Sequence, residues 1–138
     1  MKRSRRARQR GSMAVFIAMG IVALLIAIGL GIDGSRALAA SLRVGGEAEM
    51  AARTAADALA VPSTYGGTYP ALDPGAAVSA ATSYIAATQD QLGKPVQVTG
   101  NSVTVTVTTS VPTTILGLIG ISSITMTQSA MATAEEGT

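Results

Sequence analysis

The stretch GSMAVFIAMGIVALLIAIGLGID, residues 11–33, decides the fold, because its first 22 residues carry no charge. An α-helix rises about 1.5 Å per residue, so this run would extend about 33 Å and cross the hydrocarbon core of a membrane. The apolar core of a signal peptide usually has only about 7–15 residues. The length therefore favours a retained transmembrane helix over residues 12–33.

Six of the ten basic residues stand directly before this run, at positions 2, 3, 5, 6, 8 and 10. The rest of the chain has four basic and eight acidic residues, so the high isoelectric point belongs to the tail alone. A basic tail beside an apolar helix, without aromatic residues to stack on bases, follows the positive-inside rule. We therefore expect residues 1–11 to be a cytoplasmic tail, membrane lipid to surround the helix, and no nucleic-acid partner.

The sequence also allows a second interpretation, in which the apolar run is removed. Ala37, Leu38 and Ala39 fit the small-x-small pattern of a signal-peptidase site, and Ser4 to Arg6 faintly resemble a twin-arginine signal. Cleavage after Ala39 would release a secreted binding module. Two charged residues, Asp33 and Arg36, lie between the apolar run and that site, which disfavours cleavage.

Two features of the predicted helix are candidates for packing between helices. Small residues recur at every fourth position, at Ala23, Ala27, Gly31 and Ser35, which allows a second helix to approach closely. Alanine and glycine are also simply abundant in this chain. Asp33 and Arg36, three residues apart, share a helix face at the outer membrane boundary. They fit either a solvated pair or a contact with the helix of a neighbouring subunit.

Good helix formers continue beyond the apolar run and predict a helical stalk over residues 34–60. A hinge or break is expected at Gly45-Gly46, because glycine in a helix interior is destabilising. Pro62 cannot continue the helix. The residues that follow, rich in Pro, Gly, Ser and Thr, indicate a loop.

The remainder, residues 61–138, predicts a small extracytoplasmic α+β head. Asp73 is a typical N-cap before Pro74, and Gly93 is a typical stop, so a second helix is expected from Pro74 to Leu92. Three features then indicate an antiparallel sheet of about three strands. They are a strand before the Gly100-Asn101 turn, the alternation of Val103, Val105 and Val107 with threonine, and a third strand in SSITMTQSAMATA, residues 122–134.

An apolar segment, PTTILGLIGI, joins the last two predicted strands. It is either a buried crossover or a surface that touches the membrane or a partner. The candidate contact residues are Ile115, Leu116, Leu118 and Ile119.

The residue types exclude most catalytic chemistry. Without His and Cys, neither a Ser-His-Asp nor a Cys-His arrangement can form, and thiolate and imidazole metal ligands are missing. Lys94 has no matching serine motif, and the carboxylates are scattered. We expect a non-enzymatic protein with no catalytic residues, metal, cofactor or small-molecule substrate.

The order of these parts resembles the TadE/TadG-like proteins of tight-adherence (Flp) pilus assembly. The resemblance covers most of the chain and rests on Arg10-Gly11 before the apolar run, Ile32-Asp33 and Arg36 after it, and the segment AADALA at residues 55–60. A proline, the ILGLIGI stretch and a strand rich in Thr, Ser and Ala complete it.

This resemblance implies a minor pilin or assembly component in a bacterial cell membrane, with the head outside and other pilus subunits as partners. Some members are cut by a prepilin peptidase after a glycine, which would place processing between Gly11 and Ser12. Such members carry Glu at the fifth position after the cut, where this chain has Phe16. That departure puts the chain closer to the TadG-like branch.

Overall fold

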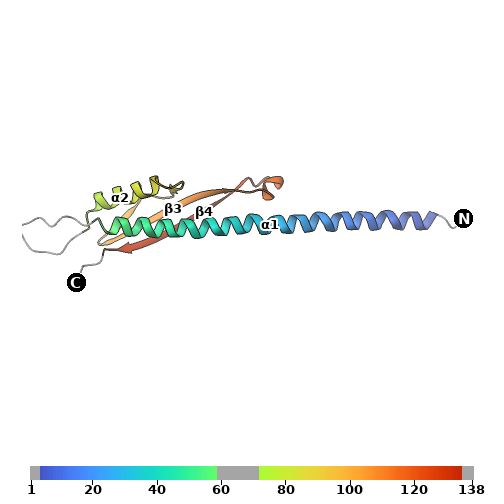
Figure 1. Ribbon diagram of the computed structural model, residues 1–138, viewed down its shortest axis with the longest axis horizontal. Coiled ribbons are helices and arrows are strands. Elements are labelled where there is room, and N and C mark those ends of the chain that lie inside the picture. The colour runs from blue at the N-terminus through green and yellow to red at the C-terminus, as the bar shows by residue number, and fades with distance from the viewer. Residues whose placement is uncertain (1–3, 59–71, 135–138) are drawn as a thin grey trace, which may run out of the picture. The chain divides into compact units, whose positions relative to one another are not determined.

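A computed structural model describes residues 4–58 and 72–134, with the side chains of the first helix from Ser12 onward. The elements are α1 (Ser4–Ala56), α2 (Pro74–Ala86), β1 (Gln91–Leu92), β2 (Gln97–Thr99), β3 (Ser102–Pro112), the short 3-10 helix η1 (Leu116–Ile119) and β4 (Ser123–Thr133) (Figure 1). The predicted α+β class, with a long N-terminal helix, one further helix and an antiparallel sheet, is confirmed.

The chain divides into two compact units. The anchor unit comprises Met1–Arg36 and Pro112–Ser123, and so joins the apolar part of α1 to the loop between β3 and β4. The head unit comprises Ala37–Val111 and Ile124–Thr138.

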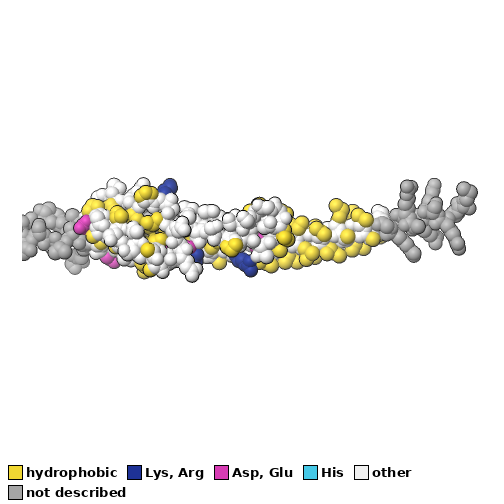
Figure 2. Space-filling model, turned by 90° about the horizontal axis from the view of Figure 1, so that it is seen from above, with side chains coloured by type: hydrophobic (Ala, Val, Ile, Leu, Met, Phe, Trp, Pro, Cys, Tyr) yellow, Lys and Arg dark blue, Asp and Glu magenta, His cyan; other side chains and the backbone are white. Residues whose placement is uncertain are grey.

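In the anchor unit, α1 is long and apolar enough to cross a membrane, and almost all of its apolar stretch is exposed. Phe16, for example, is 80% exposed. On the face drawn in Figure 2, hydrophobic side chains occupy this part of the helix. A helix that is apolar all round is stable only when protein or lipid surrounds it.

The head unit has its core on one side of the sheet. Alternation along β3 turns Val103, Val105 and Val107 to this side, where all three are fully buried. Both helices run alongside the strands in Figure 1 and supply the facing residues. The facing residues on α1 are mostly alanines, which lets the helix approach the sheet closely: Val44, Ala48, Ala51, Ala52 and Ala55. From α2 come Ala77, Ala81 and Ile85.

The strand β3 is the centre of the sheet and pairs with β1, β2 and β4. It is antiparallel to β2 through the predicted hairpin, with Val98 opposite Val103. The turn uses Gly100 at a φ of +59°, a conformation that glycine adopts without strain. Side-chain hydrogen bonds between β3 and β4, such as Thr106 to Ser129 at 2.8 Å, lie on the threonine face. The sheet has four strands rather than three, because β1 also pairs with β3.

The predicted end of the second helix is wrong. Asp73 caps α2 as expected, accepting hydrogen bonds from the N–H groups of Gly75 (2.8 Å) and Ala76 (3.1 Å). The helix ends at Ala86, and Leu92 belongs to β1, paired with Val107. Pairing with β3 supplies the backbone hydrogen bonds that a longer helix would have supplied, and it half-buries Leu92 against the core.

The expected break at Gly45-Gly46 is also wrong, since α1 continues through both glycines. Val44 and Ala48 are fully buried on either side of them. Packing of this face offsets the helix propensity that each glycine loses, about 1 kcal/mol. The stalk helix ends at Ala56 rather than at residue 60, and the predicted loop after Pro62 falls largely in residues 59–71, outside the described residues.

Candidate functional site

The anchor unit contains a buried carboxylate at the C-terminal end of the apolar stretch of α1. Asp33 is only 2% exposed. Its Oδ1 accepts a hydrogen bond from the N–H of Thr114, and its Oδ2 accepts from the N–H groups of Ile115 and Leu116, each at 2.9 Å. We call Asp33 and these three N–H groups the Asp33 clasp. It joins positions about 80 residues apart in sequence.

Two neighbours on α1 support the Asp33 clasp. One guanidinium nitrogen of Arg36 donates to the hydroxyl of Thr114 at 2.8 Å. Gly29, one turn before Asp33, is buried beneath Ile115, and a Cβ at this position would overlap the Ile115 side chain. Successive helix residues are about 100° apart, so Gly29, Asp33 and Arg36 lie on one face.

The electrostatics of the Asp33 clasp explain how a carboxylate stays beside an apolar helix. Removing a carboxylate from water is costly unless donors replace the lost hydration. Three backbone N–H groups do so here: that of Leu116 begins η1, and those of Thr114 and Ile115 directly precede it. With both oxygens bound to backbone, the clasp holds the loop rather than offering an acid or base to a substrate.

Hydrogen bonds within the loop between β3 and β4 join its two ends. The N–H of Thr113 bonds to the carbonyl of Ser122 at 3.1 Å, and that of Ile121 bonds to the carbonyl of Leu116 at 3.0 Å. The hydroxyl of Thr113 also donates to the carbonyl of Ile121. Gly120 takes a left-handed conformation, φ +94°, and ends η1. The result is a turn held together by hydrogen bonds among its own residues.

The structure places the sequence-predicted residues on two different faces of α1. Asp33 and Arg36 share a face, as their spacing predicts, but Asp33 is buried beneath the loop rather than solvated. The four small residues are all exposed and lie on about the opposite side of the helix: Ala23, Ala27, Gly31 and Ser35. Gly11 and Ser12, the expected processing site, lie within α1.

The four candidate contact residues divide into two pairs. Ile115 and Leu116 are half-buried, next to the Asp33 clasp. Leu118 and Ile119 project outward and are 82% and 68% exposed.

A second charged cluster lies in the head unit, where it joins α1 to Asp90, in the connection between α2 and β1. The guanidinium of Arg43 donates to both oxygens of Asp90, at 2.5 and 3.1 Å, and to Oε1 of Glu47 at 2.7 Å. Burial, the largest single influence, would raise the pKa of Asp90, but hydrogen bonds with Arg43, Thr109 and Glu47 and the charge of Arg43 together hold that pKa below its ordinary value. Burial, with Asp90 nearby, raises the pKa of Glu47.

The two carboxylates should therefore respond oppositely to neutralisation. Asp90→Asn should lower the free energy of unfolding at pH 7 by about 1–2 kcal/mol, because it breaks a bidentate pair whose Arg43 is half in water. Glu47→Gln should be neutral or stabilising, because Oε2 of Glu47 is buried without a hydrogen-bond partner among the described residues. Urea unfolding of the detergent-solubilised chain, followed by circular dichroism, measures both.

The pH dependence of these variants follows from the same shifts. Folding lowers the pKa of Asp90, so its contribution to stability is present above about pH 4 and is lost as the pH falls through the folded value. Asp90→Asn should remove this acid sensitivity. Folding raises the pKa of Glu47, so its charged form disfavours the folded state at neutral pH. Equal losses of unfolding free energy for Asp90→Asn and Glu47→Gln at pH 7 would contradict these opposite pKa shifts.

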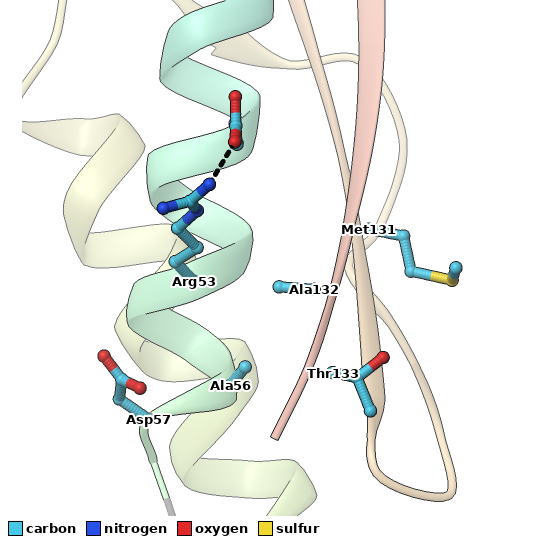
Figure 3. A pocket seen from close by; sticks show the side chains of 7 residues that line it. Arg53, Ala56, Asp57, Met131, Ala132 and Thr133 are labelled. Atoms are coloured by element: carbon cyan, nitrogen blue, oxygen red, sulfur yellow. Dashed lines mark hydrogen bonds and ion pairs between the residues drawn. The ribbon is translucent and has the colours of Figure 1, made fainter. Parts of the chain in front are cut away.

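A shallow hollow lies between the last turns of α1 and the end of β4 (Figure 3). Arg53 on its wall is already paired with Glu49, one helical turn away. Ala132 points toward α1, whereas Met131 points to the other side of the strand. Within residues 4–58 and 72–134, no group of three or more acidic side chains is placed to hold a metal ion. The hollow offers a solvated ion pair and no reactive group.

Comparison with known proteins finds no matching family model, no matching curated protein and no matching solved structure. The architecture and the Asp33 clasp therefore carry the functional argument. Sequence reasoning singled out both Asp33 and the 115–119 segment but did not join them. The available signal was a carboxylate at the end of an apolar run, because such a charge needs hydrogen-bond donors.

Proposed function

We propose that this chain is a non-enzymatic membrane protein that serves as a minor pilin or assembly component of a tight-adherence (Flp) pilus or secretion apparatus. Residues 12–33 anchor it, with the basic tail in the cytoplasm and the head outside. The observation that carries the proposal is α1 itself. One continuous helix presents an uncharged and largely exposed surface over residues 12–32 and contributes to the core of the head unit with residues 44–55.

This arrangement suits a subunit that assembles through its helix. The loop covers the Gly29 face of α1, whereas the opposite small-residue face is exposed among the described residues. In a membrane, where lipid is as apolar as the helix, close approach at small residues favours association. The resemblance to TadE/TadG-like proteins supplies the class of partner, and the basic tail supplies the orientation.

The test of this proposal is assembly in the membrane. Ala27→Leu combined with Gly31→Leu should lower the amount of pilus subunits that co-purify with the solubilised chain by at least about tenfold, since the larger side chains hold the helices apart. Ala18→Leu is the matched control, because it makes the same kind of change on the opposite face. Unchanged co-purification with the double variant would remove the small-residue face as a contact. Absence of any pilus subunit with the wild type would remove the proposed partners.

A further inference from the structure

The loop between β3 and β4 exposes apolar side chains, and it belongs to the same unit as the apolar part of α1. Leu118, Ile119 and Ile121 are 82%, 68% and 47% exposed. No charged residue occurs between Lys94 and Glu135, so nothing charged accompanies these side chains along the chain. Exposed apolar groups gathered at one turn usually indicate a binding surface.

The Asp33 clasp fixes where this turn lies along α1. The turn is held at Asp33, the residue that follows the uncharged run. The side chain of Ile115 packs on Gly29, one helical turn closer to the membrane centre. The turn therefore lies beside the outer end of the apolar run. It adjoins a helix surface on which Ile28, Leu30 and Ile32 are about half exposed.

The polar groups of the turn are also arranged for an apolar environment. Lipid offers no hydrogen bonds, so backbone groups that enter it must be paired within the protein. The N–H groups of Thr114, Ile115 and Leu116 are held by Asp33, while those of Leu118, Gly120 and Ile121 bond to carbonyls of the same turn. The side chains of Leu118, Ile119 and Ile121 are exposed on the same turn.

We propose that residues 116–121 form a second membrane contact, which enters the interfacial region of the outer leaflet beside the transmembrane helix. This inference rests on the proposed anchoring by residues 12–33. The occupant of the surface is lipid rather than protein, because the apolar patch is continuous with a helix surface that lipid must already cover. The Asp33 clasp is the positioning device that keeps the turn at this depth.

Single tryptophan probes test the inference directly, because the chain has no Trp of its own. The full chain carrying Leu118→Trp is reconstituted into vesicles of phosphatidylcholine and phosphatidylglycerol with lipids brominated near the headgroup or near the chain ends. We expect blue-shifted emission that headgroup-proximal bromine quenches at least about twofold more than deep bromine. Leu24→Trp, in the middle of the apolar run, should be quenched best by deep bromine. Met131→Trp, exposed on β4, should not be quenched.

The outcomes separate this inference from the anchoring on which it rests. If Leu24→Trp is quenched while Leu118→Trp stays red-shifted and accessible to acrylamide, the loop contact is overturned and the anchor stands. Blue-shifted but unquenched Leu118→Trp would mean that protein covers the turn, which also overturns it. If neither probe is quenched, the anchor itself fails. Adding Asp33→Ala should expose the Leu118→Trp probe to acrylamide and leave the Leu24→Trp probe in lipid.

Discussion

Replacing Asp33 with alanine should accelerate hydrogen exchange at the amides of Thr114, Ile115 and Leu116 by about 10- to 100-fold. All three amides donate to this one carboxylate, at 2.9 Å, so a single substitution removes all their acceptors together. Solution NMR of the chain in detergent micelles resolves the three positions. The head unit should keep its own slow exchange, since its core residues do not include Asp33.

Two further variants define the cause of that result. Ser35→Ala changes a nearby exposed side chain that donates to the carbonyl of Ile32, and it should leave the loop unchanged. Asp33→Asn keeps one carbonyl oxygen and turns an NH₂ group toward the amides, so an intermediate acceleration is expected. Exchange at residues 114–116 that is equally slow in wild type and Asp33→Ala would show that the clasp does not hold the loop.

Gly29→Val should displace the loop from α1 as strongly as the loss of the carboxylate does. A Cβ on Gly29 would overlap Ile115, and valine adds two further methyl groups. Overpacking of this kind typically costs about 1–3 kcal/mol, which a loop held by few contacts can relieve only by leaving its site. We expect faster exchange at Ile115 and Leu116, measured in the same micelles.

The matched control is Gly31→Val, two residues further along the same helix. Among the residues that the structure describes, no neighbouring group lies within 4 Å of a Cβ placed on Gly31, so the loop should be unaffected. Combining Gly29→Val with Ile115→Ala returns space to the site and should restore much of the protection, as expected for two residues in contact. Equal effects of Gly29→Val and Gly31→Val would mean that helix propensity, rather than contact with Ile115, determines the result.

Local patterns predicted the parts of the fold that depend on local physics. The uncharged run predicts a long helix from its composition, and the Asp73 cap and the alternation of Val103, Val105 and Val107 each act within a few residues. The structure shows a helix long and apolar enough to cross a membrane, the capped helix α2 and the strand β3. Where the local signal competes with pairing elsewhere, the sequence misleads. Leu92 fits a helix by spacing, yet it pairs with Val107 in the sheet, a partner that only the folded chain supplies.

The candidate site shows more clearly that local patterns do not reveal partners distant in the sequence. Asp33 was visible as a charge at the end of an apolar run, and spacing placed it beside Arg36. Its actual partners are backbone N–H groups, which every residue except proline carries and no sequence pattern distinguishes. Gly29 was equally hidden, because a glycine in a helix acquires meaning only when Ile115 is found above it.

The measurement that tests the central claim most directly is the N-terminal residue and intact mass of the protein extracted from its native membrane. Anchoring by residues 12–33 predicts a chain that stays in the membrane and begins at or near Met1. A start at Ser12 would keep the anchor and add prepilin-type processing after Gly11. A soluble chain that begins at Ala40 would contradict the account, because it would have lost Gly29, Asp33 and Arg36 and left a secreted binding module.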